Sequence, residues 1–351
     1  MNQAGQKAEH ENLSDRGKRN FVNYIHNFRG LAIIFVVAGH LLLNWPEGST
    51  VYKWFRVVWE NGTVLFIFIA GYLFQHLSAR FSYPDYLKKK FRNVILPYLL
   101  VSIPIIIYRV VQSDFPGYIF EMYPDFSTWP VYKKVATFYL NGSHMQQLWF
   151  IPMIFCFYII APLLIYMDRH PKLYYLIILF VGVSLIIERE PFSDIPRMFV
   201  HFISVYVFGM LLSRYKDRVL KLLQKMWLPL TLITLLAVIL NYIYFEEYGF
   251  VLSYIHKMLF CAFFIYWLWR LDKYVPKFFS VLADLSFGIF FIHYYVLLIV
   301  KAIYEKQTGH PIPGSIIYWT LNFILVMVLS VLAVQLIKKI TGKKSRYFVG
   351  C

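Results

Sequence analysis

The chain has 351 residues, of which 59% are hydrophobic and only 15% are charged, whereas about a quarter of a soluble domain is charged. The mean hydropathy of +0.54 excludes an ordinary soluble enzyme and indicates a protein embedded in a membrane. The formal net charge of +16 would suit nucleic acid. We expect no nucleic-acid partner, because most of this charge reflects membrane orientation.

Ten apolar segments are long enough to cross the hydrocarbon core, which takes about 20 helical residues. They lie at roughly 28–45, 62–79, 93–112, 147–167, 172–188, 198–213, 227–245, 250–269, 281–303 and 314–337. If the N-terminus is cytoplasmic, most lysines and arginines fall in cytoplasmic loops, as the positive-inside rule requires. We therefore expect an all-α polytopic bundle of about ten transmembrane helices, with both termini in the cytoplasm.

The segments outside these spans are short. Residues 1–27 contain no apolar core followed by a cleavage site, so we interpret them as a cytoplasmic tail rather than a signal peptide. Residues 28–337 would form the membrane domain, and residues 338–351 a basic cytoplasmic tail. Amphipathic stretches at 51–60 and 214–226 are expected to lie on the outer and inner membrane surfaces. The three cysteines lack metal-ligand spacing, and we expect no metal.

The first span carries two ionisable residues that are costly in a bilayer. Arg29 lies at its cytoplasmic end, and His40 lies about 16 Å deeper at 1.5 Å per residue. An imidazole near mid-membrane suits proton transfer or acyl transfer, because its pKa lies near neutrality. The histidine would equally suit a hydrogen-bonding strut between helices, and the arginine could simply snorkel to the interface.

Two further segments would share these depths. The loop "RFSYPDYLKKKFRN" places Lys88, Lys89, Lys90 and Arg92 at the cytoplasmic face beside Arg29. Such a basic mouth suits a phosphorylated ligand, although lysines at helix ends also act as headgroup anchors. In the ninth span, His293 lies about 18 Å from the cytoplasmic side, a depth similar to that of His40.

Five motifs follow one another between residues 24 and 337: "FRGLAIIFVVAGH", "GTVLFIFIAGYLF", "KKKFRNVILPYLL", "QLWFIP" and "LADLSFGIFFIHYYV". In sequence and order they resemble the signatures of the acyltransferase-3 family of integral membrane proteins. That family moves acyl groups, commonly acetyl, from cytoplasmic acyl-CoA to sugars of surface glycans and related molecules. The resemblance implies a multi-pass protein of the bacterial cytoplasmic membrane. Its partners would be acyl-CoA, membrane lipid and a glycan or lipid-linked glycan acceptor.

The resemblance also implies residue roles. Arg29, with Lys89, Lys90 and Arg92, would hold the phosphates of CoA. His40 would carry out the chemistry as a general base or as a transient acyl carrier, and His293 is a second candidate catalytic residue.

Three positions depart from the family pattern. His26 stands where an acid is common, and Ala70 replaces a serine. Lys89 replaces the first arginine of a basic pair. A lysine can hold a phosphate, but it lacks the two parallel hydrogen bonds that a guanidinium forms.

Two other functions compete with acyl transfer. A transporter or flippase of a lipid-linked sugar would also need many spans and buried polar groups, but it predicts paired repeats and broken helices. An ion channel would need rings of like charge or a carbonyl filter. Neither pattern is evident in the sequence. The sequence also does not identify the acceptor or the acyl group.

Overall fold

The computed structural model describes residues 22–189 and 194–351, so the expected N-terminal tail lies outside the described residues up to residue 21. Every regular element in these two ranges is helical. The helices are α2 (Asn23–His40), α3 (Thr50–Trp59), α4 (Gly62–His76), α5 (Tyr83–Lys90), α6 (Leu96–Gln112), α7 (Ile119–Met122), α8 (Val131–Asn141), α9 (Phe150–Ile159), α10 (Ala161–Arg169), α11 (Leu176–Ile186), α12 (Ile195–Arg214), α13 (Lys216–Lys225), α14 (Trp227–Ile243), α15 (Phe245–Arg270), α16 (Lys277–Thr308), α17 (Ile316–Thr341) and α18 (Ser345–Phe348).

The protein is a multi-pass membrane helix bundle, as the composition predicts. Within the described residues, 6 helical runs are long and apolar enough to cross a membrane. The number rises to 8 if the bent pairs α9–α10 (54°) and α13–α14 (83°) each form one span. Each of the ten predicted segments contains a helix, but ten crossings stay a prediction.

The two predicted surface helices behave differently. α13 meets α14 at 83°, as expected of a helix lying along the membrane surface before a span. α3 and α4 instead form one apolar run of 27 residues, Thr50–His76, that is long enough to span the membrane. The expected tail at 338–351 is also structured. α17 continues to Thr341, and the following residues form α18, with Val349 buried against the bundle.

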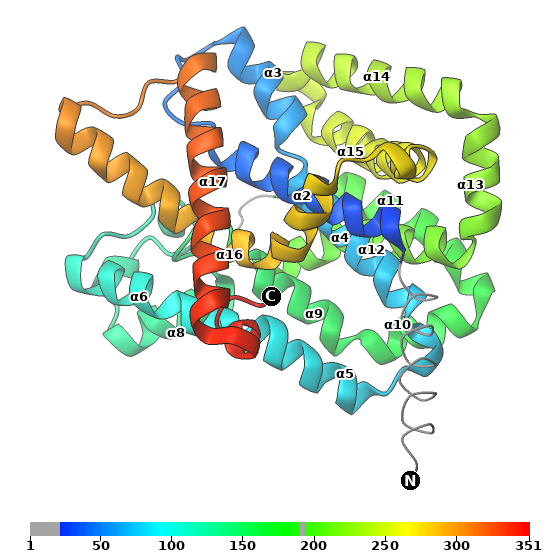
Figure 1. Ribbon diagram of the computed structural model, residues 1–351, viewed down its shortest axis with the longest axis horizontal. Coiled ribbons are helices and arrows are strands. Elements are labelled where there is room, and N and C mark those ends of the chain that lie inside the picture. Colours follow the sequence, from blue (N-terminus) through cyan, green and yellow to red (C-terminus); the bar gives the residue numbers. More distant parts are fainter. Residues whose placement is uncertain (1–21, 190–193) are drawn as a thin grey trace.

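Two close helix pairs form the centre of the bundle (Figure 1). α2 packs along α16, and α4 packs along α12. Glycine makes both approaches possible, because a Cβ at Gly30 would collide with the carbonyl oxygen of Phe279, and one at Gly71 with that of Tyr206. Small residues that bring backbones together are typical of membrane helix interfaces. The glycine that follows Ala70 is therefore explained by packing.

The outer helices present apolar side chains to the surroundings. Leu232 and Ile239 on α14, like Ile324 and Leu332 on α17, are exposed, which suits contact with lipid chains. Buried polar side chains face the inside of the bundle, and some of them hydrogen-bond to one another, as Ser184, Ser204 and Tyr254 do. Polar side chains inside a membrane bundle are costly unless they are paired or line a cavity, so these clusters show where a functional site would lie.

Candidate active site

His40 and His293 come together at the centre of the bundle. His40 is the last residue of α2, and His293 lies in the middle of α16. Their ring centroids are 5.3 Å apart, with 31° between the ring planes. The sequence predicts only that the two residues share a depth. The structure adds that the rings face one another, so the two candidate catalytic residues form one site.

The hydrogen bonds of His293 define its tautomer. Nδ1 lies 2.8 Å from the carbonyl oxygen of Ile289, and a carbonyl can only accept, so Nδ1 carries the proton. In the neutral ring, Nε2 is then an acceptor. That nitrogen is buried and has no hydrogen-bond partner among the described residues. Buried polar atoms are rarely left without partners, so a lone pair is available beside His40.

Two polar side chains, Tyr294 and Gln146, lie beside the histidine pair, and Gln146 lines a cavity there. The Tyr294 hydroxyl donates to Oε1 of Gln146 over 3.2 Å. The Tyr294 ring lies edge-on to the His40 ring, with centroids 5.9 Å apart. Gln146 also hydrogen-bonds to His40. His40 is therefore in contact with two neighbouring residues of α16, His293 and Tyr294.

Arg29 is held on the same two helices, several turns from His40. Its Nη2 donates to the Ser286 hydroxyl over 3.0 Å, and the hydroxyl in turn donates to the Ala283 carbonyl. The Asp284 carboxylate interacts favourably with the Arg29 charge and lies 3.5 Å from Nε2 of His26. An acid on α16 therefore faces the position where the family commonly has an acid and this chain has His26.

The predicted basic residues do not all reach Arg29. Lys90 is close enough for its charge and that of Arg29 to repel one another, and its ammonium lies 4.8 Å from the centroid of the Tyr158 ring. Lys89 and Arg92 are exposed, and Arg92 donates instead to Asn93. Of the four expected phosphate-binding residues, Arg29 and Lys90 are thus brought together.

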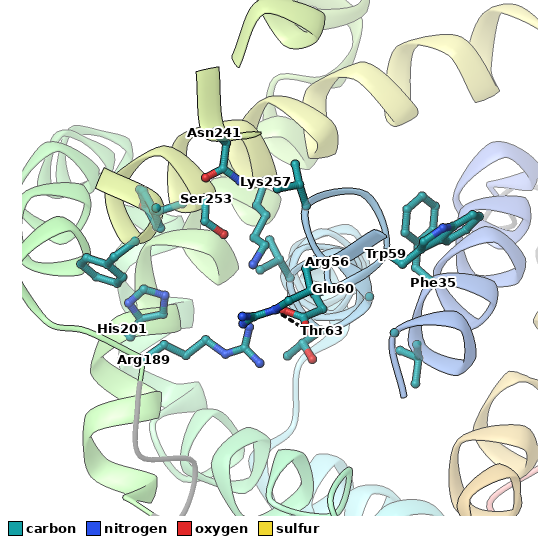
Figure 2. A pocket seen from close by; sticks show the side chains of 18 of the residues that line it. Phe35, Arg56, Trp59, Glu60, Thr63, Arg189, His201, Asn241, Ser253 and Lys257 are labelled. Atoms are coloured by element: carbon teal, nitrogen blue, oxygen red, sulfur yellow. Dashed lines mark hydrogen bonds and ion pairs between the residues drawn. The ribbon is translucent and has the colours of Figure 1, made fainter. Parts of the chain in front are cut away.

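His40 lines a polar cavity of about 550 Å³. Figure 2 shows other residues that line it. Residues from α2, α3, α12 and α15 line it, together with Glu188 and Arg189 after α11. Arg56, Arg189 and Lys257 are turned toward a common space, with Glu60 beside Arg56. This cavity lies at the end of α2 that carries His40, away from Arg29. Its volume is in the usual range of small-molecule sites, about 300–1,000 Å³.

A much smaller void of about 20 Å³ lies one helical turn from the histidine pair toward Arg29. Val36 of α2 and Phe290 of α16 line it, with Phe66, Phe150 and Phe287 nearby. The other three of the eight lining residues are Thr63, Gln147 and Trp149. The void is therefore mostly apolar and has room for about one water molecule.

Several residues of this site were not predicted from the sequence. Ser286 and Gln146 fall inside or beside motifs that attracted attention for other residues. Lys257 carried a usable signal, because a lysine within a predicted span marks a functional site by default. Arg189 carried none, since it follows a span and resembles any interfacial arginine. Glu60, at the end of the amphipathic stretch 51–60, also lines the cavity.

Two other buried histidines, His144 and His256, have structural partners. Nδ1 of His144 faces the Phe138 carbonyl at 3.0 Å, and its Nε2 lies 2.8 Å from the Ser102 hydroxyl. His256 bonds to the amides of Asn241 and Asn61. Both nitrogens of each ring are therefore used, which agrees with their omission from the predicted site.

The fold and the candidate site together describe a multi-pass membrane protein with a cavity inside a helical bundle. The family model described as an acyltransferase domain, that of the acyltransferase-3 family, matches residues 22–337. The chain therefore belongs to this family of acyltransferases. No curated protein and no solved structure matched the chain.

Proposed function

We propose that this protein is an O-acyltransferase. It would move an acyl group, in the first instance acetyl, from cytoplasmic acyl-CoA to a hydroxyl of a cell-surface polysaccharide or its lipid-linked precursor. Membership of the acyltransferase-3 family supports the reaction class. The site itself supports the division of labour between the two ends of α2.

The observation that carries the proposal is the position of the His40–His293 pair. It lies between a basic end, where Arg29 and Lys90 approach one another, and a polar cavity large enough for a sugar. Acyl transfer across a membrane needs a donor site and an acceptor site on opposite sides of one catalytic group. The void lined largely by Val36 and phenylalanines would be the route between them.

At the histidine pair, the chemistry is a nucleophilic acyl substitution. His40 would accept the proton of an acceptor hydroxyl, whose oxygen attacks the thioester carbonyl carbon as the carbon–sulfur bond breaks. The departing CoA sulfur takes up a proton. In the alternative route, His40 attacks first and carries the acyl group to the acceptor. The Nε2 lone pair of His293 would orient a protonated His40 in either route.

On the donor side, Arg29 and Lys90 would bind CoA phosphates, with Lys89 and Arg92 as a more exposed outer part of the same mouth. The phosphates would stay near the Arg29 end, while the pantetheine arm runs along α2. Because the void between them has room for about one water, the phenylalanine side chains around it must move to admit the arm.

Release of CoA thiol tests the proposal. Purified protein in detergent or nanodiscs receives acetyl-CoA and a mixture of neutral and acidic sugar acceptors. We expect free thiol, measured with a chromogenic thiol reagent, to appear together with acetylated sugar, detected by mass spectrometry. The polar cavity would also suit the transport of a lipid-linked sugar. Flipping of such a lipid in proteoliposomes, without thiol release, would favour that function instead.

The proposal includes a location and a topology. Ten spans in the bacterial cytoplasmic membrane, with both termini in the cytoplasm, would place the Arg29 end inside and the His40 cavity toward the outer surface. Reporter fusions at Phe126 and Asp217 should then report opposite sides, with residue 126 outside. Both reporters on the same side would show that the span count is wrong.

A further inference from the structure

We propose that Gln147 binds the pantetheine arm of the donor, with its side-chain oxygen Oε1 accepting a hydrogen bond from the amide N–H nearest the thioester. The inference rests on the proposed function, because it takes acyl-CoA as the donor and the small void beside the histidine pair as the route of its arm. It goes further in assigning one residue of this chain to the arm itself, as distinct from the phosphates.

The small void and the polar cavity share part of their walls. Val36, Thr63 and Trp149 line both spaces, and Figure 2 shows Thr63 on the cavity side. Val36 lies about one helical turn before His40 on α2. The void is therefore next to the cavity that His40 lines, and it is displaced along α2 toward Arg29. A donor arm that reaches His40 from the Arg29 end would pass through it.

Gln147 brings a carboxamide to the wall of this mostly apolar void. The residue is only 2% exposed, and its Nε2 donates to the sulfur of Met145. A thioether sulfur can only accept a hydrogen bond, so the carboxamide must direct its nitrogen, and not its oxygen, at Met145. Oε1 is then buried without a hydrogen-bond partner among the described residues. Buried acceptors rarely lack a partner, so this oxygen is available to a ligand N–H.

The segment that carries Gln147 is tightly packed between α8 and α9. It begins at Gly142, whose φ is +71° and whose absent Cβ would lie 2.5 Å from the carbonyl oxygen of Leu148. The preceding residue, Gln146, hydrogen-bonds to His40. One turn of the chain therefore places two consecutive glutamines, the first at the histidine pair and the second at the void. A contact made by so closely packed a segment is ordered before the ligand arrives.

The chemistry of the pantetheine arm suits this position. Its amide nearest the sulfur is only a few bonds from the thioester carbonyl, so a thioester at His40 would place this amide about one helical turn back, at the void. An N–H that enters an apolar passage loses its hydrogen bonds to water, and Oε1 of Gln147 would replace them. The contact would displace any water from the void and hold the thioester in place for attack.

Binding measurements without an acceptor can test the contact. Full-length protein in nanodiscs is titrated with three probes: CoA, 3′-phospho-ADP, which lacks the arm, and a CoA analogue in which an ester replaces the amide nearest the sulfur. We expect CoA to bind more tightly than 3′-phospho-ADP. The ester analogue, which has no N–H at this position, should bind about 5- to 50-fold more weakly than CoA.

Variants then assign the acceptor oxygen. Gln147→Met should weaken CoA binding by a similar factor, leave 3′-phospho-ADP binding unchanged and no longer distinguish CoA from the ester analogue. Because Oε1 has no partner in the free protein, the melting temperature without ligand should stay the same or rise. Gln335→Met, at an exposed position of α17, is the matched control and should behave as the wild type. Gln147→Asn, which withdraws the oxygen by one methylene, gives the same test if Gln147→Met does not fold.

Equal affinity of the wild type for CoA and the ester analogue would overturn the contact. So would a preference for CoA over the ester analogue that survives in the Gln147 variants, since the amide would then have another acceptor. These results are separable from the proposed acyl transfer, because binding is measured without turnover. A protein in which Gln147 recognises the amide, but which never releases thiol from acetyl-CoA, would keep the contact and contradict only the proposed function.

Discussion

The two ends of the α2–α16 pair differ in how their polar residues are held. At one end, Arg29 is charged, anchored by Ser286 and close to Asp284 and Lys90. At the other end, His40 and His293 pack ring against ring. The first arrangement suits a fixed charge that binds an anion, and the second suits a group that gains and loses a proton.

The difference predicts distinct kinetic consequences. Substitutions at the Arg29 end should weaken binding of acyl-CoA and leave the rate of the chemical step unchanged. Damage at the His40 end should slow the chemical step and leave acyl-CoA bound. If variants at both ends change the same kinetic constant, this division between donor binding and the chemical step is wrong.

The largest effect is expected for His40→Ala. A general base contributes about 100- to 10,000-fold to rate, so kcat should fall by that range while the affinity for acyl-CoA stays near wild type. Thiol release and isothermal titration measure the two quantities. Wild-type turnover in His40→Ala would exclude the residue from the chemistry and favour the transport function.

His144→Ala is the matched control for loss of a buried imidazole. Both nitrogens of His144 are bonded, to Phe138 and Ser102, so its loss should cost stability, by about 1–3 kcal/mol for an unsatisfied buried partner. Thermal unfolding should show a lower melting temperature, while turnover per folded molecule falls far less than in His40→Ala. A kinetic loss as large as that of His40→Ala would mean that packing alone explains both.

Sequence reasoning located the two ends of this site but not their connections. Arg29 and His40 were predicted because ionisable residues stand out in an apolar helix. The depth of His293 was predictable from the helical rise. Whether its ring faces His40 depends on the rotation of α16 against α2, which short motifs do not encode. Gly30 allows the two helices to approach closely at Phe279.

The polar cavity was harder to predict for a related reason. Its cations come from α3, α15 and the segment after α11, which are distant in sequence and meet only in the folded bundle. Lys89 shows the opposite case. It belongs to a recognisable basic motif, yet helix α5 directs its neighbour Lys90 toward Arg29 and leaves Lys89 exposed.

Arg29→Ala should produce the second-largest effect, this time on binding. Loss of a charge-assisted contact costs about 1.5–3 kcal/mol, which corresponds to about 10- to 150-fold weaker acyl-CoA affinity. We expect KM for acetyl-CoA to rise, with kcat at saturating donor within a few-fold of wild type. Arg29→Lys should recover part of the affinity. Unchanged affinity in folded Arg29→Ala would remove this residue from the donor site.

A smaller effect is expected for His293→Ala, which would act through His40. Misplacing a catalytic group by about 1 Å can cost up to about 100-fold, so kcat should fall by about 10- to 100-fold with KM for acetyl-CoA unchanged. His293→Gln, whose side-chain oxygen can replace the Nε2 acceptor, should recover more turnover than alanine. Equal losses for the two variants would indicate that the ring serves packing and not the orientation of His40.

The smallest effect separates two neighbouring lysines at the Arg29 end. Lys90 interacts with Arg29, whereas Lys89 is exposed, and exposed charges are largely screened by salt. Lys90→Met should raise KM for acetyl-CoA by about 3- to 10-fold, and Lys89→Met by less than about twofold. Both substitutions keep the aliphatic stem, so the difference reports charge and not packing. Raising the KCl concentration should shrink the Lys90 effect. Equal changes for both lysines would show that the whole loop, and not the residue beside Arg29, recruits the donor.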